Sequence, residues 1–112
     1  MSKFDEAMDK YREQLGLLNG EFDDALLTQI AKDLGPSIYL NDASKVSCSD
    51  AEEKKRVRNN FLIGKLGLND TTEVDEIVEA VCAEMGSISN KYRAVFYYLL
   101  VKNTDMAHRI MN

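Results

Sequence analysis

An uncharged run of eight residues, AVFYYLLV from Ala94 to Val101, limits what this chain can fold into more than any other feature. A helix that is apolar on all sides is usually buried on all sides, so other elements must surround this segment. The run is also rich in β-branched and aromatic residues, and periodicity alone does not separate a buried helix from a buried strand. We favour a helix over about residues 90–103, because helical spacing also includes Tyr92 and no partner strand is evident.

Amphipathic helices account for most of the remaining chain. Only one proline and six glycines occur in 112 residues, which leaves room for long helices. Apolar residues recur three and four positions apart, as on one face of a helix, in residues 3–18, 22–34, 49–66 and 70–85. The sequence therefore predicts an all-α protein, a compact bundle of about five main helices in one domain over residues 1–112, with the last long helix in its centre.

Glycines separate the predicted helices. Asn19-Gly20 and Gly67 suit the left-handed backbone angles at which many helices end. Gly35-Pro36 ends the second helix, because proline lacks the N–H that would continue it and biases the residue before it away from helical angles. The tail, residues 104–112, either extends the last helix or frays, as chain ends often do.

The connection between the second and third helices, residues 35–49, is long for a compact domain without structure of its own. We expect a short helical turn near Ser37–Leu40 and another turn near Ala43–Val46. Ser49 followed by Glu52 has the capping-box pattern, which predicts that the third helix begins there.

The charge balance and the chain's hydropathy predict a cytoplasmic protein that does not enter a membrane. The net charge is -5, which works against long-range attraction to nucleic acid or to an anionic membrane. The first residues carry charges every few positions, and no apolar run approaches the length of a signal peptide or a membrane span.

The third and fourth helices carry opposite charges. Residues 54–65 hold five bases and no acid, whereas residues 70–85 hold six acids and no base. Three interpretations are open: the two faces neutralise each other, the basic face contacts a protein partner, or it docks on the phosphates of nucleic acid. The bases are Lys54, Lys55, Arg56, Arg58 and Lys65.

The two cysteines, Cys48 and Cys82, have neither C-x-x-C spacing nor the density of a disulfide scaffold, so we expect reduced thiols in a reducing compartment. Cys82 lies on an apolar stripe and is expected in the core. Cys48 precedes a helix N-terminus, where the dipole stabilises a thiolate, so it is the one candidate reactive thiol. His108 is distant in sequence from both, and no metal-binding motif is present.

Polar residues in the 35–49 connection complete a candidate interaction surface, because binding residues often lie on loops held by a rigid scaffold. These residues are Tyr39, Asn41, Asp42 and Lys45, beside the five bases of the third helix. An equally plausible role for the connection is to pack Ile38 and Val46 while capping the third helix. The sequence indicates no catalytic residue, cofactor or metal.

Our leading hypothesis is therefore a non-enzymatic protein-interaction module with a protein partner, acting as a monomer or weak homodimer. One alternative is a nucleic-acid-binding protein that uses the basic helix 54–65, and another is a thiol-dependent enzyme or redox protein that uses Cys48. The stripe of the first helix either seals the core or pairs two chains; it consists of Phe4, Met8, Tyr11 and Leu15.

Three stretches, GPSIYLNDASKVSCSD, VRNNFLIGKLGL and NKYRAVFYYLLVK, resemble in order and spacing the bacterial family catalogued as domain of unknown function 2853. They cover most of the chain from Gly35 to Lys102. The resemblance implies a stand-alone bacterial cytoplasmic protein of about this length. It implies no reaction, cofactor or partner, so it assigns no residue a role.

Overall fold

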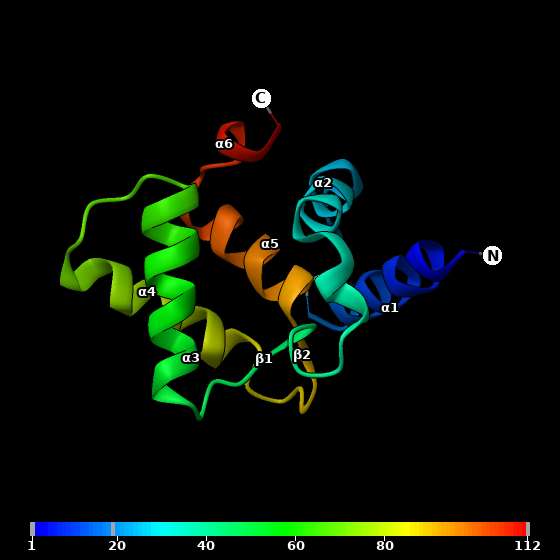
Figure 1. Ribbon diagram of the computed structural model, residues 1–112, viewed down its shortest axis with the longest axis horizontal. Coiled ribbons are helices and arrows are strands. Elements are labelled where there is room, and N and C mark those ends of the chain that lie inside the picture. The colour runs from blue at the N-terminus through cyan, green and yellow to red at the C-terminus, as the bar shows by residue number, and fades with distance from the viewer. Residues whose placement is uncertain (1, 19, 112) are drawn as a thin grey trace.

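Helices form most of the computed structural model, which describes residues 2–18 and 20–111 (Figure 1). This confirms the predicted all-α class, and the one departure from it is a pair of two-residue strands. The elements in chain order are α1 (Lys3–Leu18), α2 (Asp24–Leu34), the 3-10 helix η1 (Gly35–Tyr39), β1 (Lys45–Val46), α3 (Ala51–Arg56), the π-helix η2 (Val57–Lys65), α4 (Thr72–Glu84), β2 (Lys91–Tyr92), α5 (Arg93–Thr104) and α6 (His108–Met111).

Helix α5 runs through the middle of the molecule, as the uncharged run predicts. In Figure 1 it passes between α1 and α2 on one side and α3 and α4 on the other, and it contacts α1, α2 and α4. Every residue from Ala94 to Val101 is buried, and Phe96 and Leu100 are fully so. Because the run from Ala94 to Val101 is helical throughout, it is not the buried strand that its composition also allowed.

The apolar stripe of α1 lies inside the chain's own core. Met8, Tyr11 and Leu15 are at most 2% exposed, whereas Leu17 on another side of the helix is 76% exposed. Of the two roles open to this stripe, the structure therefore shows that it seals the core.

The helix ends follow the glycines closely. Gly67 has a φ of +79°, its N–H donates to the Ile63 carbonyl at 3.1 Å, and the N–H of Leu68 donates to the Leu62 carbonyl at 3.0 Å. Gly20 has the same left-handed φ of +79° after α1, while Asn19 lies outside the described residues. A left-handed backbone at these positions suits glycine, which has no Cβ to clash.

The helix predicted over about 49–66 is present, but its cap and its second half differ from expectation. Asp50 is the N-cap instead of Ser49, because its carboxylate accepts from the backbone N–H of Glu52 at 2.9 Å and of Glu53 at 3.3 Å. The hydroxyl of Ser49 lies 3.2 Å from that of Ser47. From Val57 onward the helix widens into the π-helix η2.

The connection forms the helical turn expected near Ser37–Leu40, as η1, and then a turn over residues 41–44; the second half of the turn that we expected near Ala43–Val46 is instead strand β1. Strand β1 pairs antiparallel with β2, with Lys45 opposite Tyr92 and Val46 opposite Lys91. We did not predict this pair of two-residue strands; it joins the connection to the residues just before α5 and does not involve the run from Ala94 to Val101.

The tail neither extends α5 nor stays without structure through residue 111. Asp105 adopts a left-handed conformation with a φ of 55° and ends α5. The chain then forms α6, which lies against α2 and buries Ile110.

Replacing Phe96 with alanine should lower the free energy of unfolding by about 3–5 kcal/mol, because a large side chain is removed from a site that is 0% exposed. Urea unfolding followed by circular dichroism measures the change. Leu17→Ala is the matched control and should shift stability by no more than about 0.5 kcal/mol. Equal stability of Phe96→Ala and the wild type would contradict the central position of α5.

Candidate functional site

Arg93 at the start of α5 binds two segments that are 40 or more positions away in sequence, the connection and α3, and also Tyr97 of its own helix. Its Nε donates to the Ala43 carbonyl at 2.7 Å, and Nη2 donates to the Lys45 carbonyl at 3.1 Å and to the Glu53 carboxylate. Its Nη1 donates to the Tyr97 hydroxyl at 3.1 Å. The side chain of Arg93 is only 16% exposed, so these bonds replace most of its contact with water.

Glu53 is the acidic partner at this centre, and its side chain is 11% exposed. It accepts from Arg93 and also from Arg56 Nη2 at 2.8 Å. Burial alone would raise the pKa of Glu53, but the hydrogen bonds from Arg56 and Arg93 outweigh burial and hold that pKa below its ordinary value. The carboxylate is therefore ionised at neutral pH and holds α3 to α5.

Aromatic packing extends this centre into the π-helix. The rings of Phe61 and Tyr97 stack with centroids 3.9 Å apart and planes 20° apart. The guanidinium carbon of Arg93 lies 5.6 Å from the centroid of the Tyr97 ring, within the range of a cation–π contact. The stack joins η2 to the same point of α5 that holds Glu53.

Above the Glu53–Arg93 pair lies an open depression of about 450 Å³, which we call the Asp42 hollow. Four of the nine residues predicted as an interaction surface line it: Asn41, Asp42, Lys45 and Arg56. The hollow carries both signs of charge, since Asp50 and Lys91 also line it.

Tyr39 and Leu40 immediately precede the Asp42 hollow along the chain. They are 47% and 59% exposed, among the most exposed large apolar side chains of the described residues. Ser44 N–H donates to the Leu40 carbonyl at 2.9 Å, which fixes the tight turn between this pair and β1. The turn therefore presents two large side chains on a well-supported segment.

The basic residues of the third helix do not form one free face. Lys54 bonds Glu79 at 2.7 Å, and Arg58 bonds Asp75 at 2.6 Å and also Asp70. The hydrogen bond that Arg58 donates to the Asp70 carboxylate is the main cause that raises the pKa of Arg58. The interpretation that the two oppositely charged helices neutralise each other therefore holds for Lys54 and Arg58.

The remaining bases lie apart from one another. Lys55 is exposed and lines a second depression of about 390 Å³, together with Lys54 and Arg58. Lys65 is exposed at the end of η2, in a separate small depression that Tyr97 and Ile110 also line. The structure thus divides the predicted surface and brings only Arg56 to the polar connection.

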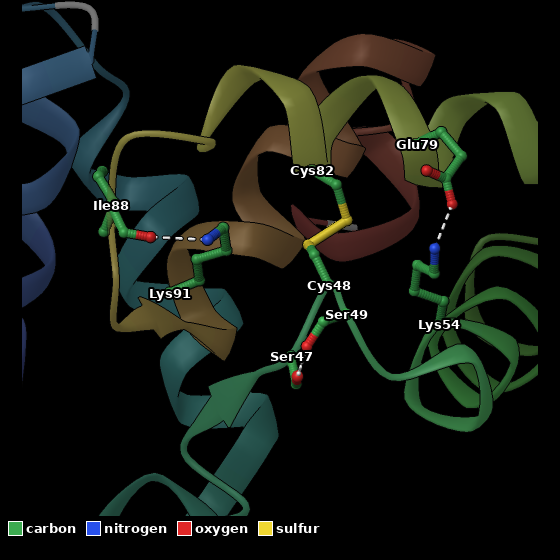
Figure 2. The surroundings of a disulfide bond; sticks show 8 residues. All are labelled: Ser47, Cys48, Ser49, Lys54, Glu79, Cys82, Ile88 and Lys91. Carbon is green, nitrogen blue, oxygen red and sulfur yellow. Dashed lines mark hydrogen bonds and ion pairs between the residues drawn. A yellow bond between two sulfur atoms is a disulfide. The ribbon is translucent and has the colours of Figure 1, made fainter.

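A disulfide joins Cys48 to Cys82, with Cα atoms 5.8 Å apart and 34 positions between them in sequence. Figure 2 shows Cys82 on α4 directed at Cys48 in the connection before α3. The expectations of reduced cysteines and of a reactive Cys48 thiol were therefore wrong. The spacing rule failed because tertiary packing brings the two cysteines together: the Lys54–Glu79 bond, also in Figure 2, places α4 beside α3.

This bond changes two inferences drawn from the thiols. A disulfide sulfur offers no thiolate, which is the species that acts as nucleophile or metal ligand. Stable disulfides belong mainly to oxidising compartments, so the cysteines no longer support a reducing one.

Other site types find little support in the part of the chain that the structure covers. Among residues 2–18 and 20–111, no group of three or more His, Cys, Asp or Glu side chains is placed to hold a metal ion. Over the same residues, no helix combines the length and hydropathy needed to cross a membrane.

Arg93 and Glu53 organise the site, yet sequence reasoning missed both. Arg93 directly precedes the uncharged run, and a charged residue bordering a buried helix is a signal that it needs a buried partner. Nothing local identifies Glu53 as that partner, because 40 positions separate it from Arg93. The neighbouring Glu52 is also a glutamate at the start of the same helix, so the sequence does not distinguish the two.

The fold and this centre define a small all-α protein that is built on a buried central helix and fastened by an internal ion pair and a disulfide. The chain belongs to the family described as protein of unknown function (DUF2853), whose model matches residues 9–108. This confirms the family resemblance carried by the three stretches between Gly35 and Lys102. No curated protein matches the chain.

Replacing both cysteines with serine should lower the free energy of unfolding by about 3–4 kcal/mol, because the bond closes a loop of 34 positions in the unfolded chain. Urea unfolding with and without a thiol reductant measures this. The reductant should destabilise the wild type and leave the double variant unchanged. Two free thiols titrated in the non-reduced wild type would contradict the disulfide.

Replacing Glu53 with glutamine should cost about 3 kcal/mol, because Arg93 stays buried without its carboxylate. The lowered pKa of Glu53 also predicts a pH effect: its contribution is complete above the ordinary value of 4.5 and is lost as the pH falls below it. Urea unfolding across this pH range should therefore show a steeper acid loss in the wild type than in Glu53→Gln. Glu52→Gln, one position away and exposed, is the control; a cost equal to that of Glu53→Gln would refute the special role of the pair.

Proposed function

We propose that the protein is a non-enzymatic protein-interaction module whose contact surface is the Asp42 hollow together with Tyr39 and Leu40. The observation that carries this proposal is the exposure of two large apolar side chains beside a hollow of mixed charge. Tyrosine and arginine are common at the energetic centres of protein interfaces, and a polar rim around an apolar anchor is their usual arrangement.

The contacts beneath this surface favour binding to a partner without a change in the conformation of the connection. Arg93 bonds the carbonyls of Ala43 and Lys45, and β1 pairs with β2, so the connection is fixed before any partner arrives. A preorganised surface loses little conformational entropy on binding. The partner that suits it presents an apolar recess for Tyr39 and Leu40, with acidic and basic groups around that recess.

Nucleic acid is a weaker candidate partner. Binding to phosphates requires several basic groups free to neutralise them together. Lys54 and Arg58 are bonded to acids of α4, and Arg56 is bonded to Glu53. The net charge of -5 opposes the same contact at longer range.

The setting of this module stays a prediction. A bacterial origin is expected from the family resemblance, and the cytoplasm from the resemblance and the chain's hydropathy; the Cys48–Cys82 bond would have to form there under oxidising conditions. A monomer or weak homodimer also stays our expectation, and the burial of the α1 stripe removes one route to a dimer.

Leu40→Ala combined with Asp42→Lys should weaken partner binding at least tenfold, because it removes one apolar anchor and reverses a charge at the rim. Tagged protein is used to capture partners from the native host, and each captured protein is then titrated against purified variants. Leu17→Ala, at an exposed apolar position elsewhere on the surface, is the control and should bind like the wild type. A partner bound equally by all three proteins would place its contact elsewhere, and no partner at all would refute the proposal.

A further inference from the structure

A further depression, of about 440 Å³, lies between the connection and α1. We call it the lysine–tyrosine hollow, after the residues that distinguish its lining: Lys3, Lys10, Lys45, Tyr11, Tyr39 and Tyr92. Its volume falls within the range of small-molecule sites, roughly 300–1,000 Å³. Few of its residues belong to the Asp42 hollow, so the two can be altered separately.

Two elements, α1 and β1, supply the lysines, and β2 forms a further wall of the hollow. Lys3 and Lys10 are seven positions apart on α1, which places them about two turns apart on one face of the helix. Lys45 comes from β1, and its Nζ donates to the Asn41 side chain at 3.2 Å. The buried Gln14 fixes the third wall, because it accepts from the Tyr92 N–H at 3.2 Å and donates to the Asn90 carbonyl at 2.7 Å.

The charge of this hollow is unusual for so acidic a chain. None of the three lysines forms an ion pair with any residue in the described ranges, whereas Lys54 and Arg58 are paired with α4. Glu6 is the one carboxylate among the lining residues. Three ammonium groups around a single hollow with one carboxylate leave a local positive potential that an anion would neutralise.

A tyrosine whose ring is buried and whose hydroxyl opens onto the hollow adds a hydrogen-bond donor for a ligand, independently of the lysines. Tyr11 is 2% exposed, and its hydroxyl forms no hydrogen bond within residues 2–18 and 20–111. Since no fully buried polar side-chain atom of these residues lacks a partner, the Tyr11 oxygen must open onto the hollow that this side chain lines. Burial, with Tyr39 and Tyr92 nearby, raises the pKa of Tyr11 to about 12, so the hydroxyl remains a donor.

The geometry points to a binding site for a small organic phosphate monoester that carries a planar ring. The three lysines suit a dianionic phosphate, because ammonium groups bind phosphate as point charges. A ligand with a single carboxylate group carries only one negative charge and would need fewer lysines. The Tyr11 hydroxyl donates a further hydrogen bond to the phosphate. The half-exposed ring of Tyr39 offers a face for stacking, and Glu6 accepts from a hydroxyl group of the ligand.

Isothermal titration of the full chain tests this site with three probes: adenosine 5′-monophosphate, adenosine and inorganic phosphate. We expect the monophosphate to bind most tightly, adenosine to bind at least tenfold more weakly, and the affinity for the monophosphate to fall as salt rises. Lys10→Gln and Tyr11→Phe should each weaken that affinity several-fold. Tyr11→Phe keeps the buried ring and removes only the hydroxyl, so we expect its thermal unfolding midpoint to match that of the wild type. An unchanged midpoint shows that any loss of affinity does not come from unfolding.

Lys55→Gln is the matched control, because it removes the same charge from an exposed position outside this hollow. Equal affinities for Lys10→Gln and Lys55→Gln would overturn the assignment, as would the absence of binding at millimolar monophosphate. Inorganic phosphate binding as tightly as the monophosphate would refute the ring-bearing ligand. Leu40→Ala alone, which changes no charge and lies outside the lining of this hollow, should leave the affinity for the monophosphate unchanged, so failure here is distinct from failure of the partner proposal.

Discussion

The buried guanidinium of Arg93 is the interaction on which the arrangement of this protein depends. Removing a guanidinium from water is costly, so its donors must all be met within the fold. They are met by two carbonyls of the connection, by Glu53 of α3 and by Tyr97 of α5 itself. The central place of α5 is therefore stable only when the connection and α3 are closed over its first turn.

Helix α4 is held against the rest of the protein by contacts of a different kind. Surface ion pairs such as Lys54–Glu79 contribute little each, because water screens them and two long side chains must be ordered. The Cys48–Cys82 bond acts on the unfolded chain instead, by limiting the conformations open to the segment from the connection to α4. Together they explain how an acidic, exposed helix stays against the core through a short apolar stripe.

The parts of the fold that the sequence predicts are those decided locally. The bounds of α1, the left-handed Gly67 and the burial of α5 follow from periodicity, glycine conformation and the absence of charge in one run. The disulfide, the Glu53–Arg93 pair and the β1–β2 pairing join residues 34 or more positions apart, so no spacing rule contains them. The N-cap of α3 shows where local prediction ends. Ser49 and Asp50 are both residue types that cap helices and both precede a glutamate by three positions, and only the backbone path of the folded chain selects Asp50.

The charged residues of the candidate site show the same difference between what local sequence predicts and what tertiary contacts decide. A cluster of bases in sequence suggested a positive face on the third helix, but each of Lys54, Arg56 and Arg58 has an acidic partner. Lysines that are scattered in sequence, at positions 3, 10 and 45, instead line one hollow and form no ion pair among the described residues. Tertiary structure brings these three together around Tyr11, whose own burial the α1 stripe predicts. A charge run in sequence is thus a poor guide to a binding surface when a neighbouring helix carries the opposite charge, because pairing cancels the run and leaves the isolated charges to set the local field.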